Sequence, residues 1–150
     1  MFVSQKSQYA LRAIFALAKR YGKGPVKIAA IAEAQAIPPR FLEVILSQLK
    51  QGGFVESKRG NEGGYYLLRD PSSLAVGEVL RFIEGPVGPV DCIAGNSSKE
   101  KCPLHGQCVF LSMWRRIQKA ISEVYGTTTF QELLNEESRM LGRYVPSYSI

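Results

Sequence analysis

Three cysteines and the only histidine of the chain lie within a span of 17 residues in the second half of the sequence. Nine residues separate Cys92 from Cys102, five separate Cys102 from Cys108, and His105 lies between the last two. An odd number of clustered cysteines is a poor disulfide framework and fits metal, cluster or redox chemistry better. Thiolates bind iron–sulfur clusters and also zinc. The spacing alone leaves an iron–sulfur cluster (2Fe–2S or 4Fe–4S) and zinc nearly tied, with a metal-free thiol switch and inert cysteines as further alternatives.

Three cysteines leave one ligand position open, because both common cluster types take four protein ligands when fully coordinated. The candidates for the fourth ligand are His105, Asp91, a residue of a second chain such as Glu43, and an exchangeable small ligand. A weakly held ligand would suit a sensor, since weak ligation invites displacement or oxidation. The segment therefore predicts a sensing site whose fourth ligand stays open.

The residues before this segment predict three helices followed by a β-hairpin. Apolar residues recur at helical spacing, and two short strand-like runs flank a glycine-rich turn. The predicted helices cover 7–21, 26–36 and 39–51, and the predicted strands cover 54–59 and 65–68. We expect Ser7 to cap the first helix. The third helix is expected to bury the stripe formed by Leu42, Ile45, Leu46 and Leu49. This order of elements is that of a winged helix-turn-helix domain.

The excess positive charge of the chain lies entirely in this front part. The first 70 residues contain 11 lysines and arginines against 5 acidic residues, whereas residues 71–150 contain 8 of each. A one-sided excess of this kind favours a polyanionic partner, most simply double-stranded DNA. The alternatives are solvated surface charges and a winged helix that contacts another protein.

The exposed positions of the third helix supply the first candidate DNA contacts. Arg40 and Glu43 lie near its N-terminal end, where recognition helices meet base edges. Arginine can bind guanine through two hydrogen bonds, and glutamate can accept one from the amino group of cytosine. Ser47 and Lys50 are expected to contact phosphates.

The hairpin tip supplies the second group of candidates. Lys58 and Arg59 lie beside glycines, and Gly60 lets the backbone approach DNA closely. An arginine at such a tip can enter a minor groove and respond to its width.

The second half of the chain predicts a short helix over 76–84, an irregular segment with the cysteines, a long helix from 107 or 108 to 125, and a last helix over 129–141. We expect Gly126 to end the long helix and Thr128 or Thr129 to cap the last one. Apolar residues of the long helix recur at spacings of 4, 3, 4 and 3, which favours packing against a partner helix over packing on the domain alone. They are Phe110, Trp114, Ile117, Ile121 and Val124. A symmetric homodimer would present two recognition helices to a palindromic operator.

The expected fold is therefore mainly α with a small β-hairpin: a winged helix-turn-helix domain plus a long C-terminal dimerisation helix. We expect four parts: a DNA-binding domain (1–84), a sensor loop (85–107), the dimerisation and C-terminal helices (108–141) and a flexible tail (142–150). Neither a signal peptide nor a membrane span is apparent, which predicts a cytoplasmic protein without a membrane partner. No phosphate loop, dinucleotide fingerprint or nucleophile elbow is apparent, which argues against an enzyme.

Several stretches resemble the Rrf-two family of bacterial winged-helix transcriptional regulators, the IscR, NsrR, RirA and CymR-like proteins. The main match is PPRFLEVILSQLKQGGFVESKRGNEGGYYLLRDPSSLAVGEVL, and SQKSQYALRAIFALA is similar to the first helix of the family. The most specific parts are Leu42–Glu43, the wing Arg59-Gly60…Gly63-Gly64-Tyr65, and the spaced cysteines before a long helix containing Trp114. The match extends to about Leu141.

The resemblance implies a dimeric transcription factor. In several members three cysteines of this loop hold an iron–sulfur cluster that reports iron–sulfur status, iron, nitric oxide or redox state. By position, Arg40, Glu43, Val44 and Arg59 would face bases and grooves. The resemblance also favours an iron–sulfur cluster at the three cysteines over zinc or a thiol switch.

Two departures from the family pattern keep the fourth ligand open. In IscR-like members a histidine ligand lies three residues after the last cysteine, where this chain has Leu111. In NsrR-like members a carboxylate near the first helix of the partner completes the site, whereas residues 4–9 here contain no carboxylate. The gap between the first two cysteines is also longer than in IscR-like members.

Overall fold

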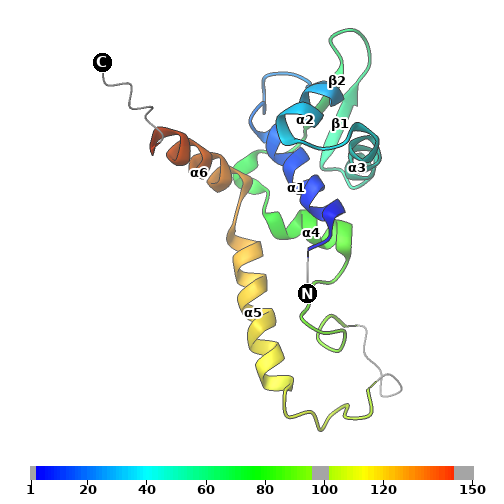
Figure 1. Cartoon of the computed structure of the whole chain (residues 1–150), viewed down its shortest axis with the longest axis vertical. Coiled ribbons are helices and arrows are strands. Elements are labelled where there is room, and N and C mark those ends of the chain that lie inside the picture. The colour runs from blue at the N-terminus through cyan, green and yellow to red at the C-terminus, as the bar shows by residue number, and fades with distance from the viewer. Residues whose placement is uncertain (1–2, 96–101, 144–150) are drawn as a thin grey trace.

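The structure, a computed structural model, describes residues 3–95 and 102–143 and confirms a mainly α fold with one small β-hairpin. In chain order the elements are α1 (Gln5–Ala18), α2 (Ile28–Gln35), α3 (Pro39–Gln51), β1 (Val55–Lys58), β2 (Gly64–Leu67), the 3-10 helix η1 (Pro71–Ser73), α4 (Val76–Glu84), α5 (Leu111–Thr127) and α6 (Phe130–Arg143). Figure 1 shows α1 to α4 and the hairpin gathered in one body, from which α5 and α6 extend. Among the described residues, no helix combines the length and apolar character needed to cross a bilayer.

The first helix begins earlier than predicted, and its cap is Ser4 rather than Ser7. The Ser4 hydroxyl accepts a hydrogen bond from the backbone N–H of Ser7 at 3.1 Å, the usual N-cap arrangement. Ser7 is buried, and its own hydroxyl donates to Glu84 Oε1 at 2.7 Å. The same carboxylate oxygen accepts from the backbone N–H of Ser4 at 2.9 Å. The prediction of Ser7 as the cap was wrong because a partner at the end of α4 takes its hydroxyl.

The turn between α2 and α3 places an alanine in the left-handed backbone region. Ala36 has φ 50° and ψ 49°, a conformation that costs an L-residue roughly 1–2 kcal/mol. The backbone N–H of Ile37 donates to the carbonyl of Ala32 at 3.0 Å and closes the turn that ends α2. The side chain of Ile37 is buried, so this strained turn fixes the entry into α3.

The hairpin is joined to the chain just before α2. Strands β1 and β2 pair antiparallel, with Lys58 opposite Gly64 at the tip. On the edge of β2 that faces away from β1, Tyr65 exchanges two backbone hydrogen bonds of 2.7 and 2.9 Å with Val26. Val26, predicted as helical, therefore extends the small sheet instead. A Cβ atom on Gly64 would lie 2.3 Å from the carbonyl oxygen of Val26, so this close approach requires glycine.

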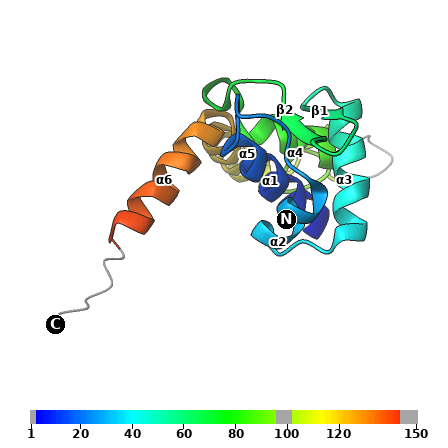
Figure 2. The ribbon, with the colours of Figure 1, turned by 90° about the horizontal axis from the view of Figure 1, so that it is seen from above.

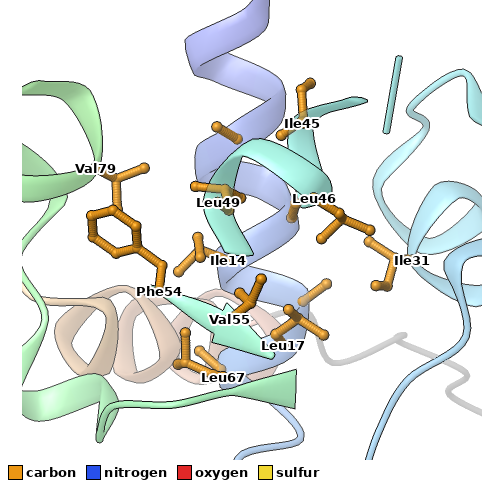
Figure 3. Close-up of a cluster of buried hydrophobic side chains, with 14 of the residues drawn as sticks. Ile14, Leu17, Ile31, Ile45, Leu46, Leu49, Phe54, Val55, Leu67 and Val79 are labelled. Carbon is orange, nitrogen blue, oxygen red and sulfur yellow. The ribbon is translucent and has the colours of Figure 1, made fainter. Parts of the chain in front are cut away.

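The apolar core surrounds α1 and draws on every element of the body (Figure 3). The predicted stripe of α3 is confirmed, because all four of its residues are buried. Two alanines of α1, Ala10 and Ala13, are fully buried and allow neighbouring helices to approach closely. Burying each larger side chain contributes about 1.5–3 kcal/mol. The core includes Ile14 and Leu17 of α1, Ile31 of α2, Phe54 just before β1, Val55 of β1, Leu67 of β2 and Val79 of α4.

A short backbone bridge fastens the junction of α5 and α6 to the body. The N–H of Val76 donates to the carbonyl of Thr128 at 2.9 Å, and the N–H of Phe130 donates to the carbonyl of Leu74 at 3.0 Å. Phe130 is fully buried. Helix α5 continues through Gly126, so the prediction that this glycine ends the helix was wrong.

Thr129 caps α6, one of the two predicted positions. Its hydroxyl accepts from the N–H of Glu132 at 3.2 Å, and the Glu132 carboxylate accepts from the N–H of Thr129 at 3.0 Å, which is a capping box. Helix α6 projects away from the body (Figure 2). It includes Gly142 and Arg143, the first two residues of the segment predicted as a tail, and residues 144–150 lie outside the described part.

Replacing Ala36 by glycine should stabilise the fold by about 1 kcal/mol, because glycine enters the left-handed region without a steric penalty. Chemical denaturation followed by circular dichroism measures the effect. The control Ala34→Gly, inside α2, should instead destabilise by up to about 1 kcal/mol. A midpoint that does not rise for Ala36→Gly would contradict the prediction.

The bonds at Glu84 also predict a pH dependence. Hydrogen bonds from Ser4 and Ser7 hold the pKa of Glu84 below its usual value. The ionised carboxylate therefore stabilises the fold above the unfolded-state pKa, and this contribution is lost as pH falls through the lower folded-state pKa. Glu84→Gln should lower the free energy of unfolding at pH 7, and the difference from the wild type should shrink in acid. The control Glu62→Gln, at the exposed hairpin tip, should show neither effect.

Candidate DNA interface and cysteine segment

Helix α3 presents the predicted base-contacting residues to solvent. Arg40, Glu43, Val44 and Ser47 are exposed, whereas the opposite face of the helix is buried in the core. Val44 is 62% exposed, which is high for an apolar side chain on a packed helix. The exposed surface of α3 carries both polar and apolar side chains, and it is free to enter a groove of DNA.

Phe41 is an exposed aromatic side chain on α3 that the sequence interpretation missed. It is 61% exposed, and its ring centroid lies 6.5 Å from that of Tyr9 on α1. It precedes Val44 by three positions, so helical spacing could have placed the two side by side. Apolar side chains of this kind can contact the methyl group of thymine.

Lys50 links the recognition helix to the hairpin. Its Nζ lies 2.9 Å from the Glu56 carboxylate and donates to the Ser57 hydroxyl at 2.6 Å. The hydrogen bond from Lys50 holds the pKa of Glu56 below its usual value. The charge of Lys50 is thus shared with β1, so besides its predicted role at phosphate it positions the hairpin against α3.

The hairpin tip exposes all three predicted contact residues, Lys58, Arg59 and Gly60. Gly60 has φ 108°, and its carbonyl accepts from the N–H of Gly63 at 2.9 Å. A Cβ on Gly63 would lie 2.1 Å from the Lys58 carbonyl oxygen, so the turn closes this tightly only with glycine there. The tight turn holds two adjacent cationic side chains outward.

The described part of the chain does not gather the predicted sulfur ligands into one site. Cys92 is exposed, Cys102 and Cys108 are half-buried, and none of the three forms a disulfide. No cluster of three or more histidine, cysteine or acidic side chains close enough to hold a metal occurs among the described residues. His105 follows Cys102 in a turn, where its N–H donates to the Cys102 carbonyl at 3.1 Å. The donor types suit an iron–sulfur cluster or zinc, but their placement in a single chain does not.

Helix α5 has one broad apolar face, part of which lies against the chain and part of which is exposed. Trp114 and Ile121, predicted for the partner-facing stripe, are half-buried within the chain. The exposed part of this face carries Met113, Ile117 and Val124, and the exposed ring of the N-cap residue Phe110 continues it. No residue of α5 is fully buried, which is unusual for a helix of 17 residues.

An outward-facing third helix, followed by a two-stranded hairpin with a basic tip, defines the class of winged-helix DNA-binding proteins. Within this class the chain belongs to the Rrf2 family, described as iron-dependent transcriptional regulators, which residues 3–136 match.

Curated relatives agree with this membership. The chain is 32% identical over 133 residues to the transcriptional regulator CymR of Bacillus subtilis, covering 89% of each protein. It is 34% identical over 137 residues to the regulator IscR of Yersinia pseudotuberculosis, covering 91% of this chain and 81% of the relative. The chain is therefore a transcriptional regulator and not an enzyme, as the sequence predicted.

Solved structures match the fold over a similar share of the chain. CymR of B. subtilis, described as the global cysteine regulator, has a TM-score of 0.74 at 32% identity and covers 91% of this chain and 98% of its own. IscR of T. potens has a TM-score of 0.70 at 33% identity, with 91% and 88% covered. CymR of Staphylococcus aureus in an oxidised form has a TM-score of 0.66 at 28% identity, with 89% and 95% covered.

Removing the arginine of the hairpin tip should weaken DNA binding. For Arg59→Ala we expect about tenfold lower affinity for a duplex selected from random DNA, and a salt slope reduced by about one. Fluorescence anisotropy at several salt concentrations measures both. Arg139→Ala on α6 removes the same charge far from the tip along the chain and should change neither. Equal affinity of Arg59→Ala and wild type would remove the hairpin from the interface.

Proposed function

We propose that this regulator is a cytoplasmic repressor that binds a palindromic DNA operator sequence-specifically as a homodimer. The observation that carries the proposal is the exposed surface of α3, joined through Lys50 to a hairpin with a basic tip. Helix α3 would lie in the major groove, with Arg40 and Glu43 at base edges, and Ser47 at phosphate. Arg59 would enter the neighbouring minor groove. This assigns residues 1–84 to DNA binding.

The support for the homodimer is the exposed part of the apolar face at α5. Its four large side chains recur at helical spacing and would cover one another across a two-fold axis. Burying them would remove an apolar stripe that a monomer exposes to water. Residues 108–141 would thus form the dimerisation part, and residues 85–107 the sensor loop between the two functions.

For the sensor loop we propose a cluster of the 2Fe–2S or 4Fe–4S type held by Cys92, Cys102 and Cys108. Its support is the description of the family as iron-dependent, the IscR relatives and the three thiols. Such a cluster, when bound, supplies reversible oxidation and ligand exchange. His105, Asp91 and Glu43 of a second chain are the candidates for the fourth ligand. Binding would require the loop to bring the cysteines closer together than the described residues have them.

A metal-free thiol switch is the second candidate. Two observations favour it: the described cysteines lie apart without a metal-holding group, and a related CymR exists in an oxidised form. Oxidation of loop thiols would then change DNA affinity directly. Zinc bound by the same cysteines is the structural alternative.

One preparation separates these candidates and tests the function. Anaerobically purified protein is analysed for iron, sulfide and zinc, its visible spectrum is recorded, and its affinity for selected duplex DNA is measured with thiols reduced and oxidised. We expect the wild-type protein to contain iron and sulfide and to absorb visible light. Cys102→Ala should lose the iron, the sulfide and the absorbance. His105→Ala, the matched variant of the same loop, loses the absorbance only if this histidine is a ligand.

Other outcomes decide against the cluster. Zinc alone would indicate the structural site, and metal-free protein whose DNA affinity responds to thiol oxidation would indicate the switch. The proposed function itself would be overturned if the protein were monomeric and bound duplex DNA no more tightly than it binds heparin, at every metal content and thiol oxidation state.

A further inference from the structure

Two large apolar side chains lie next to each other on the solvent side of α3. Phe41 is 61% exposed and Val44 is 62% exposed. They are three positions apart on the helix, which brings their Cβ atoms to within about 5–6 Å of each other. A single exposed apolar residue is common on a protein surface and needs no explanation, whereas a contiguous apolar patch marks a contact surface. Phe41 and Val44 together form the apolar patch of α3.

Val44 is a poor choice for the stability of the chain itself. Within the described part of the chain, its side chain belongs neither to the hydrophobic core nor to the half-buried layer packed against that core. Valine also forms helices less readily than alanine, because its branched Cβ loses χ1 freedom against the preceding turn. The residue therefore exposes apolar surface and lowers helix propensity without a compensating contact in this chain, which indicates a contact outside it.

The polar surroundings of the patch favour DNA over an apolar protein surface. Val44 is the apolar member of a shallow hollow whose other lining residues are polar: Glu43, Ser47, Gln48 and Gln51. An apolar protein surface seated there would take these polar groups out of water without giving them partners. The floor of the major groove offers hydrogen-bond donors and acceptors around its apolar groups, and the cations of Arg40 and of the hairpin tip suit the phosphates beside it.

The major groove presents one kind of apolar group, the C5-methyl of thymine. The side chains of Phe41 and Val44 have neither a donor nor an acceptor, so they cannot bind the N7, O6, O4 or amino groups of the bases. We propose that Val44 is a specificity-determining residue that contacts the methyl group of a thymine in each half of the operator, with Phe41 extending the apolar contact on the side of α1. This inference rests on the proposed function, in which α3 lies in the major groove, and it names a base that the operator must contain.

The position of the thymine and the rigidity of the contact follow from the helix. Val44 lies four residues after Arg40, about 6 Å along the helix axis, and base pairs are spaced about 3.4 Å apart. The thymine should therefore lie within two base pairs of the pair that Arg40 contacts. Valine in a helix has one strongly preferred rotamer, so little side-chain entropy is lost on contact. The Phe41 ring is positioned from α1 by Tyr9, whose own ring lies under the Arg12 guanidinium at 5.6 Å.

Replacing thymine by deoxyuridine tests the proposal, because it removes the methyl group and leaves every hydrogen-bonding group of the base pair in place. The full chain is titrated by fluorescence anisotropy, at one salt concentration, against a duplex selected from random DNA in which each thymine of the half-sites is replaced in turn. We expect at least one replacement to weaken wild-type binding about three- to fivefold, the effect of removing one buried methyl group. Replacement of a thymine in the flanking DNA should change nothing.

A variant assigns the methyl contact to Val44. Val44→Ala should bind the thymine and deoxyuridine duplexes with affinities that agree within about twofold, since the two changes remove the same contact and are not additive. The control Leu68→Ala, which truncates a 45% exposed side chain at the end of β2 away from the tip, should keep the full difference. Val44→Ala should also raise the midpoint of chemical denaturation, because alanine is the better helix former, so the lost discrimination is not a loss of folding.

Two results would overturn the inference while leaving the proposed function intact. One is wild-type protein that binds the selected duplex tightly but tolerates every deoxyuridine replacement. The other is Val44→Ala protein that discriminates against deoxyuridine as strongly as the wild type. Wild-type protein that binds no duplex in preference to random DNA would overturn both the inference and the sequence-specific binding on which it rests.

Discussion

Helix α1 contacts α2, α3, α4, α6 and β2, and its buried side is the surface on which the other elements are positioned. Its small residues, Ala10 and Ala13, let neighbouring helices approach closely, while Ile14 and Leu17 fill the space between them. Burial on this scale supplies the main stabilising free energy of a body this small. The orientation of α3 is therefore not set by α3 alone. It depends on α1 and on the strained turn at Ala36, and the hairpin follows through its bonds to Val26 and Lys50.

Most of the fold was predictable because its signals are local. The apolar stripe of α3 and the glycine-rich turn of the hairpin each lie within about a dozen residues, and both are confirmed. The errors occur where a distant residue decides. Ser7 lost its expected capping role to a bond with Glu84, and Val26 left its predicted helix to pair with Tyr65. Neither partner can be inferred from spacing alone, because both bonds depend on how the elements pack.

The site divides in the same way. Exposure of Arg40, Glu43 and Arg59 follows from helical spacing and from the turn, and the structure has them exposed. The link from Lys50 to β1 was not foreseen, since it requires the strand to return beside the helix. The placement of the cysteines was not predictable from sequence, because thiolates that bind one metal or cluster must be brought together by a loop closure that no local pattern specifies. Family membership, rather than residue spacing, is what favours iron there.

The division of the apolar face of α5 into a half-buried and an exposed part has a mechanical consequence. In the proposed dimer, the exposed part of this face would meet the same part of the partner helix, while Trp114 and Ile121 beside it remain against the same chain. A small rotation of α5 about its own axis would then shift both contacts at once. Because the end of α5 is held to the body beside Phe130, that rotation would change the separation of the two copies of α3. Successive major grooves on one face of a duplex recur about every 34 Å, so a change of a few ångströms in that separation would suffice to take one of the two helices out of register with the DNA.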